Sequence, residues 1–277
     1  MMMGLEEGTV LSNGVHIPWI GLDSCSINNP ETVERGVLAA IKAGYRAIDT
    51  AASYQNERGI GNALSLSGMD RKQLFITAKL NSISHGYNNT LAAFNESRKK
   101  LGVDYIDLYL IQWPVRGELE ETWRALEILY NRGEVRAIGV CNFEENDLKL
   151  IMRRSQIKPH VNQIEYHPLK SQKQLIHFCK QNQIQIQARN PYSREELFQQ
   201  KVLLDIAVKH EKTPAQIAMK WALQNGIPVV PAFSSINEVQ ENIQMMSFTL
   251  PIEDMVTLHF LNNSRMTGPN TGQYFCE

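Results

Sequence analysis

The sequence predicts an α/β protein, a closed (β/α)8 barrel of the TIM type whose bottom is covered by an N-terminal β-hairpin. Short apolar strands alternate with amphipathic helices at intervals of about 25 to 35 residues, which is typical of right-handed βαβ units around a parallel sheet. Seven or eight such units follow one another, and eight units close a barrel. No Pro/Ser-rich linker, low-complexity tract or close repeat interrupts them, so residues 1–277 are expected to form a single domain.

The expected elements follow the chain in order, beginning with the hairpin. Asn13-Gly14 stands between β-formers, so residues 10–17 are predicted to form a hairpin with a type I′ turn. An amphipathic helix is expected over 32–43, and Gly44 ends it. Further strands are expected at 47–48, 74–78, 105–111, 137–140, 161–164, 184–188 and 228–230, with a short one near Phe248. Further helices are expected at 90–101, 119–131, 145–155, 173–182, 199–210, 213–225, 236–245 and 253–261.

Composition excludes several classes of function. The net charge of −1 gives no electrostatic basis for binding nucleic acid or an anionic membrane. No apolar run approaches the roughly 18 residues of a membrane span, and the first residues do not resemble a secretory signal. The four cysteines are far apart and the seven histidines lack metal-ligand spacing, so we expect reduced thiols and no metal site. A cytoplasmic, monomeric protein that acts on a small molecule is the expectation.

Three residues at strand ends carry the first chemical hypothesis. Asp49 stands where the strand 47–48 stops, and Tyr54 follows on a polar loop of small residues. Lys79 ends a β-branched and aromatic strand, where a lysine needs a carboxylate partner, and Asp49 is the candidate. An Asp–Lys pair beside a phenol lowers the pKa of that phenol and makes it a usable proton donor. The alternative is that Asp49 forms a turn and Tyr54 is half-buried packing.

In a barrel of this kind, function lies on the loops after the strands, at the C-terminal face. The sequence has many polar residues at these positions. They are Asp23, Ser24, Cys25, Asp49, Tyr54, Lys79, Gln112, Trp113, Cys141, Asn142, Gln163, Glu165, Arg189, Asn190, Ala232 and Phe233.

Longer motifs around these residues resemble the aldo-keto reductases over nearly the whole chain. They are Asp49-Thr50-Ala51, Tyr54, Asn56-Glu57, Ile76-Thr77, Lys79, Leu101-Gly102, Asp104 to Ile111, Trp113-Pro114, Ala137 to Val140, Asn142-Phe143, Val161 to Pro168, Lys212 to Ile217 and Glu241-Asn242. The resemblance implies reduction of a carbonyl by NADPH in a barrel closed by a hairpin. It also implies that Tyr54 is the acid, that Lys79 and Asp49 tune it, and that a fourth residue orients the carbonyl.

The sequence departs from the family pattern at that fourth residue, where the family usually has histidine and this chain has Gln112. Glutamine can donate a hydrogen bond to a carbonyl but cannot titrate. The early Gly-Leu-Gly-Thr-Trp pattern is also changed, to Gly21-Leu22-Asp23-Ser24-Cys25. Ser24 is still expected to contact the cofactor. Cys25, His85 and Trp113 are expected to line the substrate pocket.

The cofactor end departs further. The lysine and arginine that bind the 2′-phosphate of NADPH in the family match Ala232 and Glu238, and a small serine matches Phe233. The tyrosine on which the nicotinamide stacks matches Arg189, and the serine beside it matches Asn190. What remains of the family's cofactor contacts is Asn142 and Gln163 for the nicotinamide amide, Cys141 in place of serine, and Asn242 for the adenine.

Three functions are therefore open. The first is a reductase of a carbonyl or imine that binds NADH or NADPH through a rearranged clamp, with weak binding expected. The second is a cofactor-independent enzyme that uses Tyr54, Lys79 and Asp49 for acid–base chemistry. The third is a non-catalytic ligand-binding or regulatory relative, in which the Asp–Lys pair persists because removal of one partner leaves the other charge unpaired.

Overall fold

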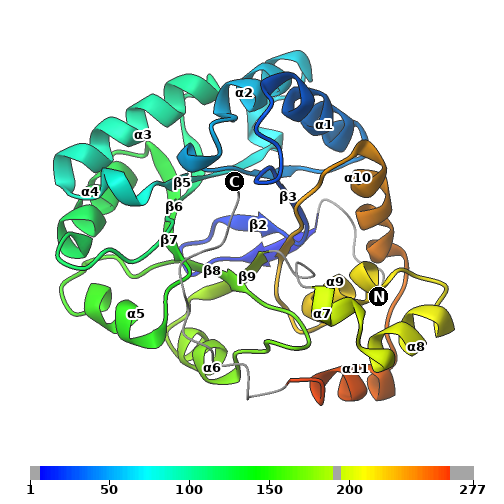
Figure 1. The fold of residues 1–277 in the computed structure, drawn as a ribbon. Helices are drawn as coiled ribbons and strands as arrows, with labels where there is room; N and C mark the ends of the chain where they lie inside the picture. The colour runs from blue at the N-terminus through cyan, green and yellow to red at the C-terminus, as the bar shows by residue number, and fades with distance from the viewer. Residues whose placement is uncertain (1–6, 190–194, 263–277) are drawn as a thin grey trace.

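A ring of eight parallel strands forms the centre of the molecule (Figure 1). The structure, a computed structural model, describes residues 7–189 and 195–262. The strands are β3 (Gly21–Asp23), β4 (Ala47–Asp49), β5 (Phe75–Leu80), β6 (Ile106–Ile111), β7 (Val135–Cys141), β8 (Val161–Glu165), β9 (Gln185–Arg189) and β10 (Val229–Val230), hydrogen-bonded in sequence order. Single parallel bridges, Ile20 to Val229 and Asp23 to Ala232, join the first strand to the last and close the barrel. The predicted fold class is confirmed.

Helices surround the strands on the outside (Figure 1). They are α1 (Pro30–Lys42), α2 (Glu57–Leu66), α3 (Tyr87–Leu101), α4 (Leu119–Asn131), α5 (Glu145–Met152), α6 (Lys173–Gln181), α7 (Glu195–Phe198), α8 (Lys201–Lys209), α9 (Pro214–Gln224), α10 (Ile236–Ile243) and α11 (Ile252–His259). Short 3-10 turns are η1 (Ala52–Tyr54), η2 (Arg71–Gln73), η3 (Ser82–Ser84) and η4 (Gln244–Ser247). Every helix in the described part of the chain is too short or too polar to span a lipid bilayer.

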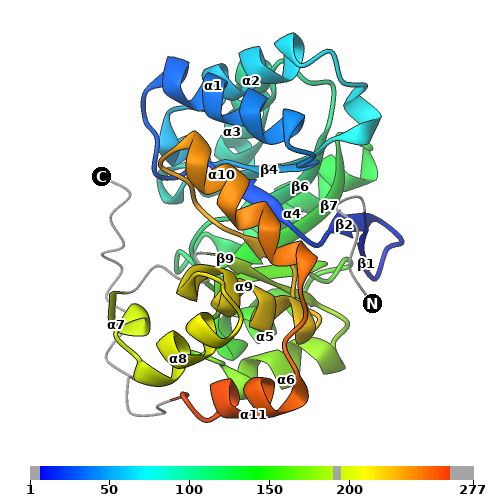
Figure 2. The same ribbon diagram turned by 90° about the vertical axis from the view of Figure 1, so that its right-hand side faces the viewer.

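The N-terminal hairpin, β1 (Gly8–Val10) and β2 (His16–Pro18), closes one end of the barrel (Figure 2). Its Leu11 and Ile17 are buried among inward-facing residues from the strand starts, such as Phe75. The turn differs from the predicted type I′. Asn13 does not have the positive φ that this type requires, whereas Gly14 does (83°), and Leu11 N donates to Val15 O. The extra loop residue makes this a longer turn with glycine at the left-handed position.

The strands alternate between an inner and an outer core, and this alternation positions the site. In β4, Ala47 packs inside the barrel with the hairpin, while Ile48 faces outward and packs under the helices. The next residue, Asp49, therefore faces inward at the C-terminal end. Steps of two from an inward apolar residue lead from Phe75 through Thr77 to Lys79, from Ala137 through Gly139 to Cys141, and from Val161 to Gln163.

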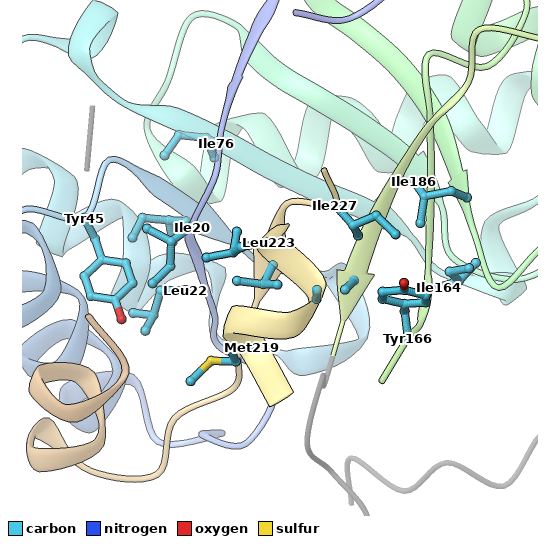
Figure 3. Packing of buried hydrophobic residues seen from close by; sticks show 14 of the residues in the cluster. Ile20, Leu22, Tyr45, Ile76, Ile164, Tyr166, Ile186, Met219, Leu223 and Ile227 are labelled. Atoms are coloured by element: carbon cyan, nitrogen blue, oxygen red, sulfur yellow. The ribbon is translucent and has the colours of Figure 1, made fainter. Parts of the chain in front are cut away.

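The outer core is continuous apolar packing between the strands and the helices (Figure 3). Ile20 and Leu22 pack near Met219 and Leu223 of α9, and the ring of Tyr166 stacks on Trp221 with centroids 4.7 Å apart. This packing holds the strands in register, so the inward residues at their ends have fixed places.

One strand was missed and one strand prediction was wrong. No strand was predicted over Gly21–Asp23, because three residues that begin with glycine carry little strand signal; pairing with β4 forms it. The short strand expected near Phe248 is absent among the described residues. The 3-10 turn η4 (Gln244–Ser247) ends just before Phe248. The ring of Phe248 packs instead against the side chains of Lys212, in the loop before α9, and Lys220 of α9.

Candidate active site

The side chains of Asp49, Tyr54 and Lys79 meet inside the C-terminal mouth of the barrel. Lys79 Nζ donates a hydrogen bond to Asp49 Oδ1 and lies 3.4 Å from the hydroxyl of Tyr54. The exposed fractions are 1% for Asp49, 4% for Tyr54 and 1% for Lys79. Asp49 and Lys79 come from neighbouring strands, and η1 returns the chain so that Tyr54 lies over them. This arrangement can hold a proton on the phenol and stabilise the phenolate that remains after the proton leaves.

The electrostatics of this group differ in one respect from the sequence prediction. Burial raises the pKa of Tyr54 well above its ordinary value, and the Asp23 carboxylate raises it further, against the lowering effects of Lys79 and Arg189. The predicted lowering by Lys79 is present, but the effect of burial is larger. Burial would lower the pKa of Lys79, yet Asp49 raises it, so the ammonium stays charged.

Gln163 connects Asp49 to the next strands. Its Nε2 donates to Asp49 Oδ2 at 2.6 Å and to Gln187 Oε1 at 2.9 Å, and the Cys141 thiol lies 3.6 Å from its Oε1. Both amide hydrogens of Gln163 therefore have acceptors within the protein. Gln187 was not among the predicted site residues. The signal was its position two residues before Arg189 on β9, which places both side chains on the inner face.

Gln112 follows β6 and Asn142 follows β7, at the same end of the barrel as Lys79. Gln112 is 9% exposed, and its Oε1 accepts a hydrogen bond of 3.0 Å from Ser53 Oγ, so its amide nitrogen is the group left to donate to a ligand. Asn142 donates to the backbone oxygen of Gln112 at 3.1 Å. Trp113 follows Gln112 and is half-buried. His85 is buried, and neither ring nitrogen has a hydrogen-bond partner among the described residues.

The loop after β3 brings Asp23, Ser24 and Cys25 to the mouth. Ser24 Oγ donates to the backbone oxygen of Asp49 at 3.1 Å, and Asn56 fixes the loop by donating to Ser24 O at 2.9 Å. Asp23 is fully buried, and its Oδ1 accepts from Cys25 N at 3.1 Å. The Ser24 hydroxyl thus supports Asp49 within the protein.

Arg189 ends β9 and faces inward, because Ile186 and Ala188 belong to the outer core. Its side chain is 8% exposed. Burial would lower the pKa of Arg189, but the nearby Cys141, Tyr54 and Asp23 raise it, so the guanidinium is charged. The next predicted position, Asn190, lies outside the described residues, as does Cys276.

The start of α10, where the sequence analysis expects the family's phosphate clamp, carries a carboxylate that is hydrogen-bonded within the protein. Glu238 Oε2 accepts hydrogen bonds from Ser234 N and, at 3.0 Å, from Ser234 Oγ. Ser235 caps α10 by accepting from Glu238 N at 3.2 Å. The negative charge therefore lies at the positive N-terminal end of α10, an arrangement that stabilises the helix. Ala232 is half-buried nearby in the chain, and Asn242 is buried on α10.

The sequence analysis placed Phe233 among the residues at the mouth of the barrel. Its side chain does not point there. The ring is 1% exposed and packs in the outer core, where a Cβ added to Gly36 of α1 would collide with its Cε2 and Cζ atoms. The phenyl ring occupies space that only glycine leaves free.

This contact gives a stability prediction. Gly36→Ala should lower the free energy of unfolding by about 1–3 kcal/mol, because the added methyl overpacks the site. In a Phe233→Ser background the same change should cost much less. Denaturant unfolding of the four proteins measures both costs, and equal costs in the two backgrounds would show that Phe233 does not lie over Gly36.

Comparisons with known proteins agree with the architecture. The profile of the aldo/keto reductase family matches residues 19–263. The chain is 43% identical over 270 residues to the glyoxal reductase of Bacillus subtilis (strain 168), with 98% of each chain covered. It is 36% identical over 268 residues to the methylglyoxal reductase DkgA of Escherichia coli (strain K12), covering 95% of this chain and 96% of that protein.

Solved structures give the same result. An aldo-keto reductase from a Medee basin deep-sea metagenome library superposes with a TM-score of 0.89 at 39% identity, covering 92% of this chain and 95% of the other. An aldo/keto reductase from Brucella melitensis superposes with a TM-score of 0.88, also at 39% identity, covering 92% and 98%.

Proposed function

The chain belongs to the aldo/keto reductase family, and on that premise we propose that it reduces the carbonyl of a small molecule with a reduced nicotinamide dinucleotide, Tyr54 acting as the acid. The observation that carries the proposal is the contact of Lys79 Nζ with both Asp49 and the Tyr54 hydroxyl. Aldo-keto reductases generally use NAD(P)H, and the relatives named above are reductases of glyoxal and methylglyoxal.

Five buried side chains of the site have roles in the proposed reaction. When bound, a reduced nicotinamide supplies the hydride that the carbonyl carbon receives. Tyr54 donates its hydroxyl proton to the carbonyl oxygen, and the Lys79 ammonium stabilises the resulting phenolate. Asp49 keeps Lys79 charged and oriented, and Gln163 fixes the second oxygen of Asp49. The free amide nitrogen of Gln112 donates a hydrogen bond to the same carbonyl oxygen.

The residues fit a dinucleotide without a 2′-phosphate better than one with it. Glu238 and Ala232 match the two cations of the family's clamp, and the Glu238 carboxylate is held in place by Ser234. A phosphate brought to this end of α10 would meet a fixed negative charge. We therefore propose that NADH is the preferred cofactor and that binding is weak, with Asn142, Cys141 and Asn242 as further contacts.

Cofactor choice is the first test. Loss of two charge-assisted contacts costs about 1.5–3 kcal/mol each, and the facing carboxylate adds repulsion. A total of about 4–6 kcal/mol should make NADPH bind about 10³- to 10⁴-fold more weakly than to an intact clamp. NADH should bind equally well or better than NADPH. The double change Ala232→Lys with Glu238→Arg should restore NADPH binding selectively. Titrations that follow the fluorescence of the reduced nicotinamide measure each affinity.

The matched control is Ala232→Met with Glu238→Gln, which has similar side-chain volumes and no added positive charge. It should relieve the repulsion but recover only a small part of the NADPH affinity. Micromolar NADPH binding by the unmodified protein would contradict the assignment of this clamp.

A second candidate is acid–base chemistry on a carbonyl or imine without a dinucleotide. It is favoured by Gln163, whose amide hydrogens are both taken by Asp49 and Gln187 and are not free for a nicotinamide amide. In that case Tyr54-dependent exchange of hydrogen beside a carbonyl should be detectable by NMR in deuterated water. A protein with neither reduction nor exchange would be a ligand-binding relative.

A further inference from the structure

The backbone of Gln112 is held on both sides, whereas its side chain is held by one contact. The backbone nitrogen donates to Leu80 O at 3.2 Å, and the backbone oxygen accepts from Asn142 Nδ2 at 3.1 Å. Among the described residues, the side chain has one hydrogen bond, from Ser53 Oγ to Oε1 at 3.0 Å, and its amide nitrogen has none. Loss of the Ser53 hydroxyl would therefore release the amide group and leave the backbone of Gln112 in place.

A glutamine needs such a contact more than the histidine that the family usually has at this position. The glutamine side chain rotates about three bonds and the histidine side chain about two, so the glutamine has more freedom to lose when it is fixed. A hydrogen-bond donor helps a reaction most when it is already in place as charge develops on the carbonyl oxygen. A neighbouring side chain has to fix Gln112, and Ser53 is the described residue that contacts its amide.

The turn η1 carries Ser53 and Tyr54 as consecutive residues. Tyr54 N donates to Ala51 O at 3.0 Å, which fixes the turn. The Tyr54 hydroxyl lies 3.4 Å from Lys79 Nζ, while the half-buried Ser53 contacts Gln112. One short turn therefore supplies the proton donor of the proposed reaction and the contact that holds its second hydrogen-bond donor.

We propose that Ser53 is a positioning residue for the reduction, because it holds the amide of Gln112 with the nitrogen toward the carbonyl oxygen of the substrate. This inference rests on the proposed reductase function. A hydroxyl can also accept a hydrogen bond, but a Ser53 that accepted from Nε2 would leave Oε1 to face the carbonyl oxygen, and two acceptors repel. When Ser53 donates to Oε1, the amide is polarised and its N–H becomes a stronger donor.

The test is a double-mutant cycle between positions 53 and 112, measured as the single-turnover rate of methylglyoxal reduction at saturating NADH. Ser53→Ala should lower this rate about 3- to 10-fold, the contribution of one neutral hydrogen bond. Gln112→Met keeps the length of the side chain, removes its donor and should lower the rate about 10²-fold. In the Gln112→Met background, Ser53→Ala should change the rate by less than about twofold, because no amide remains to be positioned.

Two further variants control for other effects of the substitution. Ser53→Thr keeps the hydroxyl and should retain most of the wild-type rate. Ser247→Ala removes another serine hydrogen bond, from Ser247 Oγ to Gln244 O at 2.7 Å in η4, and should leave the rate unchanged. The dissociation constant of NADH, from nicotinamide fluorescence, should be the same in all the proteins. Circular dichroism confirms the fold of each variant.

The mobility of the amide gives a second readout that needs no turnover. The NMR signals of the Gln112 side-chain amide are identified by their absence in ¹⁵N-labelled Gln112→Met protein. Their order parameter, measured without cofactor, should lie above about 0.6 in the wild type and below it in Ser53→Ala.

Equal rates of reduction by the wild type and a folded Ser53→Ala protein would overturn the inference. An equal loss from Ser53→Ala in both backgrounds would also overturn it, because the effect would then act through η1 and Tyr54 and not through Gln112. Reduction that does not depend on Ser53 keeps the proposed reductase and removes this role. A lower order parameter in Ser53→Ala, without reduction of methylglyoxal by the wild type, keeps the hold on Gln112 and removes the reductase.

Discussion

Tyr54→Phe is expected to lower the rate of carbonyl reduction by about 10²- to 10⁴-fold, because the substitution removes the proton donor and nothing else. The phenyl ring keeps its buried place, and the protein loses one long contact of 3.4 Å with Lys79 Nζ. The free energy of unfolding should change by about 1 kcal/mol or less. Single-turnover oxidation of NADH with methylglyoxal, followed by absorbance, measures the rate.

Tyr109→Phe is a matched control, because it removes another buried tyrosine hydroxyl, on β6 and away from the site. Its hydroxyl has no hydrogen-bond partner among the described residues, so the rate should not fall. A Tyr54→Phe protein that turns over at the wild-type rate would remove Tyr54 from the role of acid.

The largest stability effect is expected at Lys79. Lys79→Met should lower the free energy of unfolding by about 3–5 kcal/mol, because it leaves Asp49 buried without its cation. The double variant Asp49→Asn with Lys79→Met should recover a large part of this loss, since no uncompensated charge remains. Urea unfolding of the two single variants and the double variant gives the coupling energy between the two side chains.

Additive losses in the three variants would contradict this account, because they would show that Asp49 and Lys79 do not interact. Activity should be lost in all three, even where stability recovers, since Tyr54 then lacks the ammonium beside it. Recovery of stability without recovery of rate separates the structural contribution of the pair from its chemical one.

The fold and the centre of the site were predictable because each follows from a regular pattern along the chain. Alternation of strands and helices specifies the barrel, and the period of two along β4 and β5 brings Asp49 and Lys79 to one face. Their contact with Tyr54 needed only a loop that returns over the strand ends. The strand β3 (Gly21–Asp23) was missed because pairing with its neighbour forms it, and its own sequence shows little preference.

Other features depend on side-chain directions that the sequence does not encode locally. Gln163 and Asp49 are 114 residues apart, and their hydrogen bond depends on the closure of the whole ring. Phe233 turned into the outer core because Gly36, on a distant helix, leaves room for its ring. The pKa of Tyr54 rises because burial outweighs Lys79, and burial is a property of the complete mouth.

The most direct test of the proposed function follows the hydride itself. NADH deuterated at both C4 positions is mixed with methylglyoxal and the wild-type protein, and the alcohol product is analysed by mass spectrometry. We expect the new carbinol carbon to carry deuterium from the cofactor, one deuterium for each NADH oxidised. Failure of a folded, NADH-saturated protein to form a deuterated alcohol from methylglyoxal or glyoxal would contradict the assignment of this barrel as a reductase.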